Sequence, residues 1–123
     1  MCKSKAKDLY ISSLFKKNMA YAKTLKPDAI YILSAKYGLL NLDDEIEPYD
    51  VTLNTMKVAE RKSWAENLLS QLEKVESTED TKFIFLAGNN YRKYLMSYLH
   101  YTEVPMEGLP IGKQLQFLTE KLR

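Results

Sequence analysis

The sequence is poor in the residues that build covalent cross-links and metal centres. Its 123 residues include one cysteine, Cys2, and one histidine, His100. One cysteine excludes a disulfide within the chain and a cluster of thiolate ligands, so we expect a reducing compartment, no metal site and no cofactor. The chain also has no apolar run long enough to span a bilayer, and its start, MCKSKAKD, has no secretory signal. We therefore expect a cytoplasmic protein with no membrane partner.

A large excess of charge of one sign is also missing. The chain has 18 Lys and Arg against 16 Asp and Glu, and a net charge of +2 is too small to indicate nucleic-acid binding by itself. The hydrophobic content of 46% is enough to bury one core in a chain of this length. We expect residues 1–123 to form a single α/β domain.

Predicted strands alternate with predicted helices along the chain. Short apolar runs at Ile30–Leu33 and Phe83–Ala87 predict buried strands, and Tyr101–Val104 predicts a short edge strand. Apolar residues at helical spacing predict helices over residues 8–24, from 54 or 55 to about 75, over 89–99 and from about 112 onward. This order favours a three-layer α/β fold, in which helices cover both faces of a mostly parallel sheet of about three strands. Ligands of such folds bind outside the carboxyl ends of the strands.

Three polar residues follow the first predicted strand. Ser34, Lys36 and Tyr37 supply a hydroxyl, an ammonium and a phenol, and Gly38 allows the chain to turn where a side chain would obstruct it. These groups are suited to holding a phosphate or carboxylate by charge-assisted hydrogen bonds. The alternative is a solvated lysine between a buried tyrosine and a turn.

A second polar group follows the next strand and opens a helix. Gly88, Asn89, Asn90, Tyr91 and Arg92 combine free backbone N–H groups with a guanidinium, which together suit an anion. The alternative is helix capping by Asn89 or Asn90 without a ligand.

The two strand ends are expected to form one site. Because both follow the carboxyl ends of predicted strands, we expect Lys36 to face Arg92 across neighbouring strand ends.

Two acidic residues are candidate catalytic groups. Tyr49 is suited to stacking on a base, and Asp50 to activating a water for N-glycosidic bond cleavage; the alternative places Asp50 in a turn cap and Tyr49 in the core. Glu107 is the second candidate acid or base. Gly108 permits close backbone approach and Lys113 lies at another helix start, so both are candidate ligand-binding residues; the alternative is a turn and helix cap.

Two residues of the long predicted helix lie about one turn apart. We expect Trp64 in the core, and Arg61 either paired with Asp50 or Glu107 or in contact with a ligand.

Four segments taken together resemble a known family. They are SAKYGLL at 34–40, PYDVTL at 48–53, AGNNYR at 87–92 and PMEGLPIGKQLQFL at 105–118. The family is domain of unknown function 6884, found in bacteria and their phages. Its members usually begin with an apolar strand and a serine-cysteine-x-lysine-x-lysine loop, whereas this chain begins Met1-Cys2-Lys3-Ser4-Lys5. The resemblance therefore implies a missing strand and a sheet edge that a second copy could cover, giving a homo-oligomer.

Three functions fit these patterns. The first is a nucleotide- or nucleobase-directed protein with a polar pocket at the strand ends, performing N-glycosidic bond hydrolysis or a related nucleotide reaction. The second is a phage- or defence-type protein that binds a nucleotide or nucleic acid without turnover. The third is an oligomeric interaction protein. The sequence leaves the choice between catalysis and binding open.

Overall fold

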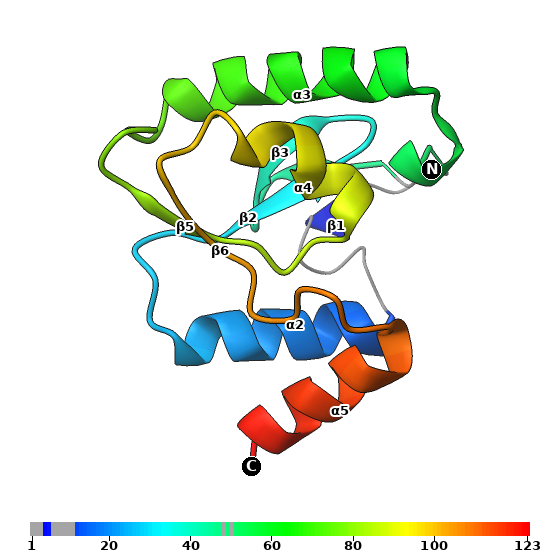
Figure 1. Ribbon diagram of the computed structural model, residues 1–123, viewed down its shortest axis with the longest axis vertical. Helices are drawn as coiled ribbons and strands as arrows, with labels where there is room; N and C mark the ends of the chain where they lie inside the picture. The colour runs from blue at the N-terminus through cyan, green and yellow to red at the C-terminus, as the bar shows by residue number, and fades with distance from the viewer. Residues whose placement is uncertain (1–3, 6–11, 48, 50) are drawn as a thin grey trace. The chain divides into compact units, whose positions relative to one another are not determined.

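The computed structural model describes residues 4–5, 12–47, 49 and 51–123 (Figure 1). The fold mixes helices with short strands, so the α/β class is confirmed. The elements in chain order are β1 (Ser4–Lys5), α2 (Ser13–Thr24), β2 (Tyr31–Ser34), β3 (Gly38–Asn41), β4 (Glu45–Ile46), the 3-10 helix η1 (Leu53–Thr55), α3 (Val58–Glu73), β5 (Lys82–Ile84), α4 (Asn89–Met96), β6 (Tyr101–Glu103) and α5 (Ile111–Lys121).

The strands pair two by two. β1 is antiparallel to β4, β2 pairs with β3, and β5 is parallel to β6 with Phe83 opposite Thr102. The single three-stranded sheet expected from the sequence therefore differs from the pairing of the described residues. One cause is the short connection after Ser34, because three residues can join only antiparallel neighbours and β2 takes β3 as its partner. The three-layer arrangement stays a prediction.

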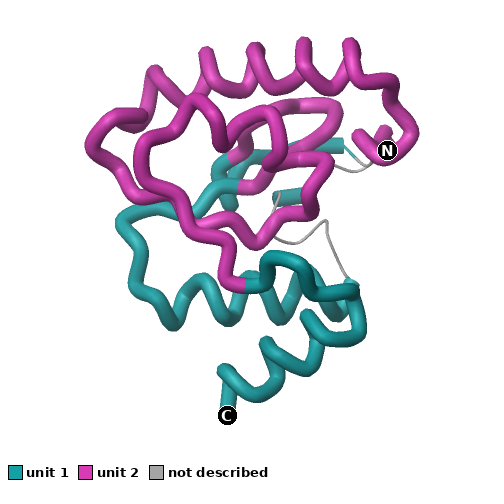
Figure 2. Tube along the Cα trace, in the orientation of Figure 1, with its two compact units in different colours: residues 1–31, 41–48, 106–123 teal, residues 32–40, 49–105 magenta. Residues whose placement is uncertain are grey.

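Contacts divide the chain into two compact units (Figure 2). Unit 1 contains Met1–Tyr31, Asn41–Pro48 and Met106–Arg123, and unit 2 contains Ile32–Leu40 and Tyr49–Pro105. The expectation of a single domain stays a prediction. Among the described parts of both units, no helix is long and apolar enough to cross a bilayer.

The core of unit 2 is built around α3. Its apolar residues recur at helical spacing, so one face is buried against η1, β5 and α4 (Figure 1). The core residues are Leu53, Trp64, Ala65, Leu68, Leu69, Leu72, Phe85, Leu95 and Leu99. The prediction that Trp64 is a core residue is confirmed. The helix begins later than predicted because Met56 is extended, with φ −85° and ψ 152°, and separates η1 from α3.

Strand β5 is covered less than predicted. Its central residue Phe83 is half-buried, but Ile84 is 37% exposed and Lys82 forms an ion pair with Glu103 of β6 at 2.9 Å. The predicted strand Phe83–Ala87 is thus confirmed over fewer residues than expected and is buried in part, because Phe85 is 9% exposed whereas Ile84 is open to solvent.

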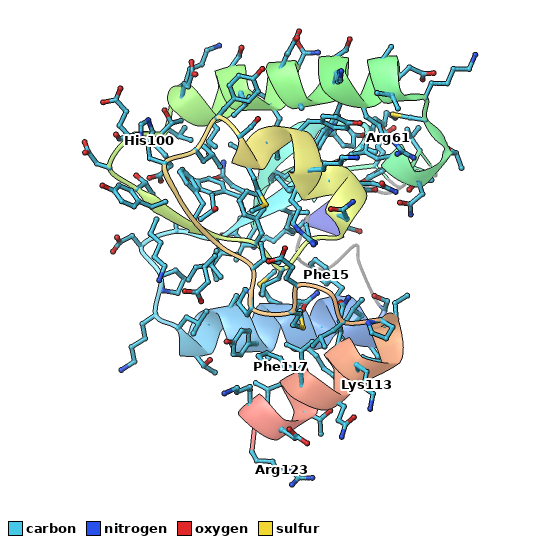
Figure 3. The ribbon with its side chains drawn as sticks, viewed as in Figure 1. Phe15, Arg61, His100, Lys113, Phe117 and Arg123 are labelled. Carbon is cyan, nitrogen blue, oxygen red and sulfur yellow. The ribbon has the colours of Figure 1, made fainter. Side chains whose placement is uncertain are left out.

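Unit 1 is held by the packing of α2 on α5. Tyr21 and Phe117 pack edge to face with ring centroids 5.7 Å apart, and Lys17 Nζ donates to Thr119 Oγ1 at 3.1 Å. Phe117 lies on α5 (Figure 3). Helix α2 begins after Ser12, whose side chain accepts from the Phe15 N–H at 3.1 Å. The predicted start at Asp8 lies outside the described residues.

A strained residue ends α2 and gives a stability prediction. Lys26 has φ 51°, a left-handed conformation that glycine adopts at little cost. We expect Lys26→Gly to raise the free energy of unfolding by about 0.5–1 kcal/mol in urea denaturation, because glycine has no Cβ to crowd the backbone in this conformation. Lys23→Gly, which removes the same charge inside the last helical turn, should lower it by about 1 kcal/mol. Equal losses in both variants would contradict the prediction.

Candidate functional site

The turn after β2, residues 35–37, is held by the Ser34 hydroxyl. Ser34 is fully buried, and its Oγ accepts from the N–H groups of Tyr37 at 3.0 Å and Lys36 at 3.3 Å. The same hydroxyl donates to Tyr49 Oη at 2.8 Å. One donor and two acceptor positions are then filled by the protein itself. Ser34 thus shapes the turn, and its contacts do not support the expectation that it binds a ligand directly.

Two side chains of α3 hold the same turn. Trp64 Nε1 donates to the Ser34 carbonyl at 2.9 Å. Gln71 Oε1 accepts from the Leu39 N–H at 3.0 Å, and Gln71 Nε2 donates to the Tyr37 carbonyl at 3.5 Å.

Gly38 is required by this arrangement. It has φ +79°, and a Cβ placed there would overlap the Gln71 amide oxygen. The prediction that a side chain would obstruct the chain at this point is confirmed. The turn is therefore held by Ser34 and Trp64 on one side and by Gln71 on the other.

An open groove of about 690 Å³ lies between this turn and one face of α3. The turn contributes Lys36 and Tyr37 to its lining. Lys36 is exposed, with its Nζ 5.3 Å from the centroid of the Tyr37 ring, and that ring packs edge to face on Tyr49 at 5.7 Å. A cation and an aromatic ring predicted from the sequence thus lie together beside the groove.

Four polar residues that α3 contributes to the groove were not among the site residues predicted from the sequence. Glu60, Ser63, Asn67 and Gln71 recur every three or four positions, so they share one face of the helix. Ser and Asn are weaker helix formers than Ala or Lys. Exposed helix positions with no ligand or partner usually carry strong helix formers. The presence of Ser63 and Asn67 on one face was therefore the signal available in the sequence.

A second polar network joins η1 to α4. Arg61 donates through Nε to the Leu53 carbonyl at 2.8 Å, through Nη2 to the Asn54 carbonyl at 3.2 Å and through Nη1 to Asn90 Oδ1 at 3.2 Å (Figure 3). Asn90 Nδ2 in turn donates to Asn54 Oδ1 at 2.8 Å. Arg61 is thus used as a cross-link inside unit 2. Its expected alternative partner Asp50 lies outside the described residues.

The start of α4 is arranged differently from simple capping. Gly88 is the N-cap, and no side chain hydrogen-bonds to the cap, so the alternative role of Asn89 or Asn90 as a cap is not found. Gly88 and Asn89 are exposed, and Arg92 Nη1 donates to the Ala87 carbonyl at 2.9 Å.

Trp64 joins the two predicted strand-end groups. Its ring packs edge to face on Tyr91 at 5.7 Å, while its indole N–H reaches the Ser34 carbonyl at 2.9 Å. The Tyr91 hydroxyl also lies 3.3 Å from Thr52 Oγ1. Lys36 contacts Tyr37 and Arg92 contacts Ala87, and their facing one another stays a prediction.

Three predicted site residues belong to unit 1. Gly108 has φ +79° in a turn closed by the Leu109 N–H on the Met106 carbonyl at 3.1 Å, and Glu107 beside it is exposed. Lys113 is an exposed residue in the first turn of α5 (Figure 3). Their ligand-binding and catalytic roles stay predictions.

The comparisons with known proteins give one result. The family described as Family of unknown function (DUF6884) matches residues 2–120. No curated protein and no solved structure matches the chain.

Proposed function

This chain belongs to the Family of unknown function (DUF6884), and on the contacts of its own residues we propose that the groove between the β2–β3 turn and α3 binds a mononucleotide. The observation that carries the proposal is the preformed turn. Ser34, Trp64 and Gln71 fix the segment that places Lys36 and Tyr37 at the groove. A preformed site loses little conformational freedom on binding, so more of the interaction energy contributes to affinity.

The groove offers a matching group for each part of a nucleotide. The Lys36 ammonium suits a phosphate, and the Glu60 carboxylate suits the hydroxyls of the sugar. Asn67 and Ser63 each supply a donor and an acceptor, as the edge of a base requires. The volume of about 690 Å³ lies within the range of about 300–1,000 Å³ typical of small-molecule sites.

We propose that the protein binds the nucleotide, and hydrolysis of the bound nucleotide is the second candidate function. Hydrolysis of an N-glycosidic bond needs a carboxylate placed to activate water, for which Asp50 is the candidate. Incubation of the protein with each nucleotide, followed by chromatography, separates the two forms. A ligand recovered unchanged, with the affinity of Asp50→Asn equal to that of the unaltered protein, supports binding alone. Release of a free base that stops in Asp50→Asn supports hydrolysis.

Lys36 gives the direct test of the groove. We expect Lys36→Ala to weaken mononucleotide binding at least about 10-fold, because a charge-assisted hydrogen bond to phosphate is lost. Isothermal titration with a panel of mononucleotides and the matching nucleosides measures the effect, which should disappear for the nucleosides.

Lys74→Ala is the charge-matched control. Lys74 is an exposed residue at the C-cap of α3 in the same unit. Its replacement should leave affinity unchanged. The proposal fails if no nucleotide binds the folded protein, or if Lys36→Ala binds as tightly as the control.

A further inference from the structure

Two lysines converge on one tyrosine ring at the surface formed by α3 and α4. Lys62 Nζ lies 5.8 Å from the centroid of the Tyr94 ring, and Lys93 Nζ lies 5.6 Å from it. Both lysines are exposed. The ion pairs found among the described residues are Lys5–Asp43 and Lys82–Glu103, so no described carboxylate pairs with either cation. This leaves two positive charges beside one aromatic ring.

The segment that contains α4 is also free of acidic residues and rich in tyrosine. Residues 81–102 contain no Asp or Glu, and they include four of the nine tyrosines. Tyr98 follows one turn after Tyr94 and is 63% exposed. Its N–H donates to the Leu95 carbonyl at 3.0 Å, so the backbone still follows a helical path at this point. Lys62, Lys93, Tyr94 and Tyr98 together are called the Tyr94 face below.

We infer that the Tyr94 face binds single-stranded nucleic acid. Lysine ammonium groups neutralise backbone phosphates, and an exposed tyrosine ring stacks on a base. Stacking on a side chain requires a base that is not already stacked in a duplex, which favours a single strand over a double helix. The low net charge of the chain does not oppose this, because the cations are concentrated locally.

This inference is independent of the proposed mononucleotide groove. The groove is lined by residues 35–38 and by the face of α3 that carries Glu60, Ser63 and Asn67, whereas the Tyr94 face uses Lys62 and α4. A failure of either proposal leaves the other standing, because the two tests use different ligands and different variants.

Fluorescence anisotropy with labelled homopolymers tests the inference. The probes are oligothymidylate and oligouridylate of about 12 nucleotides, within the usual site sizes of about 4–16. We expect the Lys62→Ala/Lys93→Ala double variant to reduce the salt dependence, as the slope of log K against log salt, by about 1.4, since each phosphate contact contributes about 0.7 for a single strand. Tyr98→Ala should weaken binding about 5- to 100-fold, and Tyr98→Phe should restore it, because phenylalanine keeps the stacking ring.

The controls separate a specific face from general charge. Lys57→Ala/Lys74→Ala removes two exposed lysines from the ends of α3 and should leave the salt slope within about 0.3 of that of the unaltered protein. Thermal unfolding of every variant verifies that the fold is intact. The inference is overturned if neither homopolymer binds at about 50 mM salt. A duplex that binds more tightly than its single strands, or a Tyr94-face lysine variant that behaves as the control, also overturns it.

Discussion

Replacement of Trp64 by alanine is expected to lower the free energy of unfolding by about 3–5 kcal/mol, as for other large aromatic residues removed from a core. Trp64 is 9% exposed, packs on Tyr91 and donates its indole N–H to the Ser34 carbonyl at 2.9 Å. The substitution therefore opens a cavity and leaves a buried carbonyl without its donor. Urea denaturation followed by far-UV circular dichroism measures the change.

Two further substitutions separate the parts of this effect. Trp64→Phe keeps an aromatic ring but has no N–H, so we expect a loss of about 1–3 kcal/mol from the unpaired Ser34 carbonyl. Val58→Ala, at a position that is 52% exposed on the same helix, should change stability by less than about 0.5 kcal/mol. A Trp64→Phe variant as stable as the unaltered protein would show that the hydrogen bond contributes nothing.

Gly38→Ala is expected to lower the free energy of unfolding by about 2–3 kcal/mol. A left-handed residue with a Cβ costs about 1–2 kcal/mol, and displacement of Gln71 weakens its hydrogen bonds to Leu39 and Tyr37, each worth about 1 kcal/mol. Chemical denaturation at equilibrium provides the measurement.

Gly112→Ala is the matched control for Gly38→Ala. Gly112 lies in α5, and nothing within 4 Å would meet an added Cβ. We expect this variant to be more stable by about 0.5–1 kcal/mol, because alanine is favoured over glycine inside a helix. If both variants lose stability alike, the crowding at Gly38 is not the cause.

The helices and three of the strands, β2, β5 and β6, could be predicted because their signals are local. Ala65, Leu68 and Leu72 repeat at the spacing of one helical face, and the apolar run before Ser34 marks β2. The other strands gave weaker signals. β4 lies in an acidic segment with the composition of a loop. β3 follows a turn that is held by Gln71, which is 32 residues away from Leu39 in the sequence.

The sequence predicted the position of the candidate site better than the contacts within it. The sequence indicated that Ser34, Lys36 and Tyr37 follow a strand. It did not indicate that the Ser34 hydroxyl bonds to Tyr49 and to the backbone of the turn. The link between Arg61 and Asn90 spans 29 residues and has no local signature. The groove face of α3 gives only a weak signal in the sequence, because Ser63 and Asn67 lie among charged residues of the same helix.

The pairing of α2 with α5 imposes an order on the formation of the fold. Lys17 and Thr119 are separated by 102 positions, so their contact closes a long loop and carries the entropy cost of that closure. Every segment of unit 2 lies between residues 32 and 105. Folding of unit 2 brings the two ends of this loop closer together, so we expect α2 to pack on α5 after unit 2 has formed.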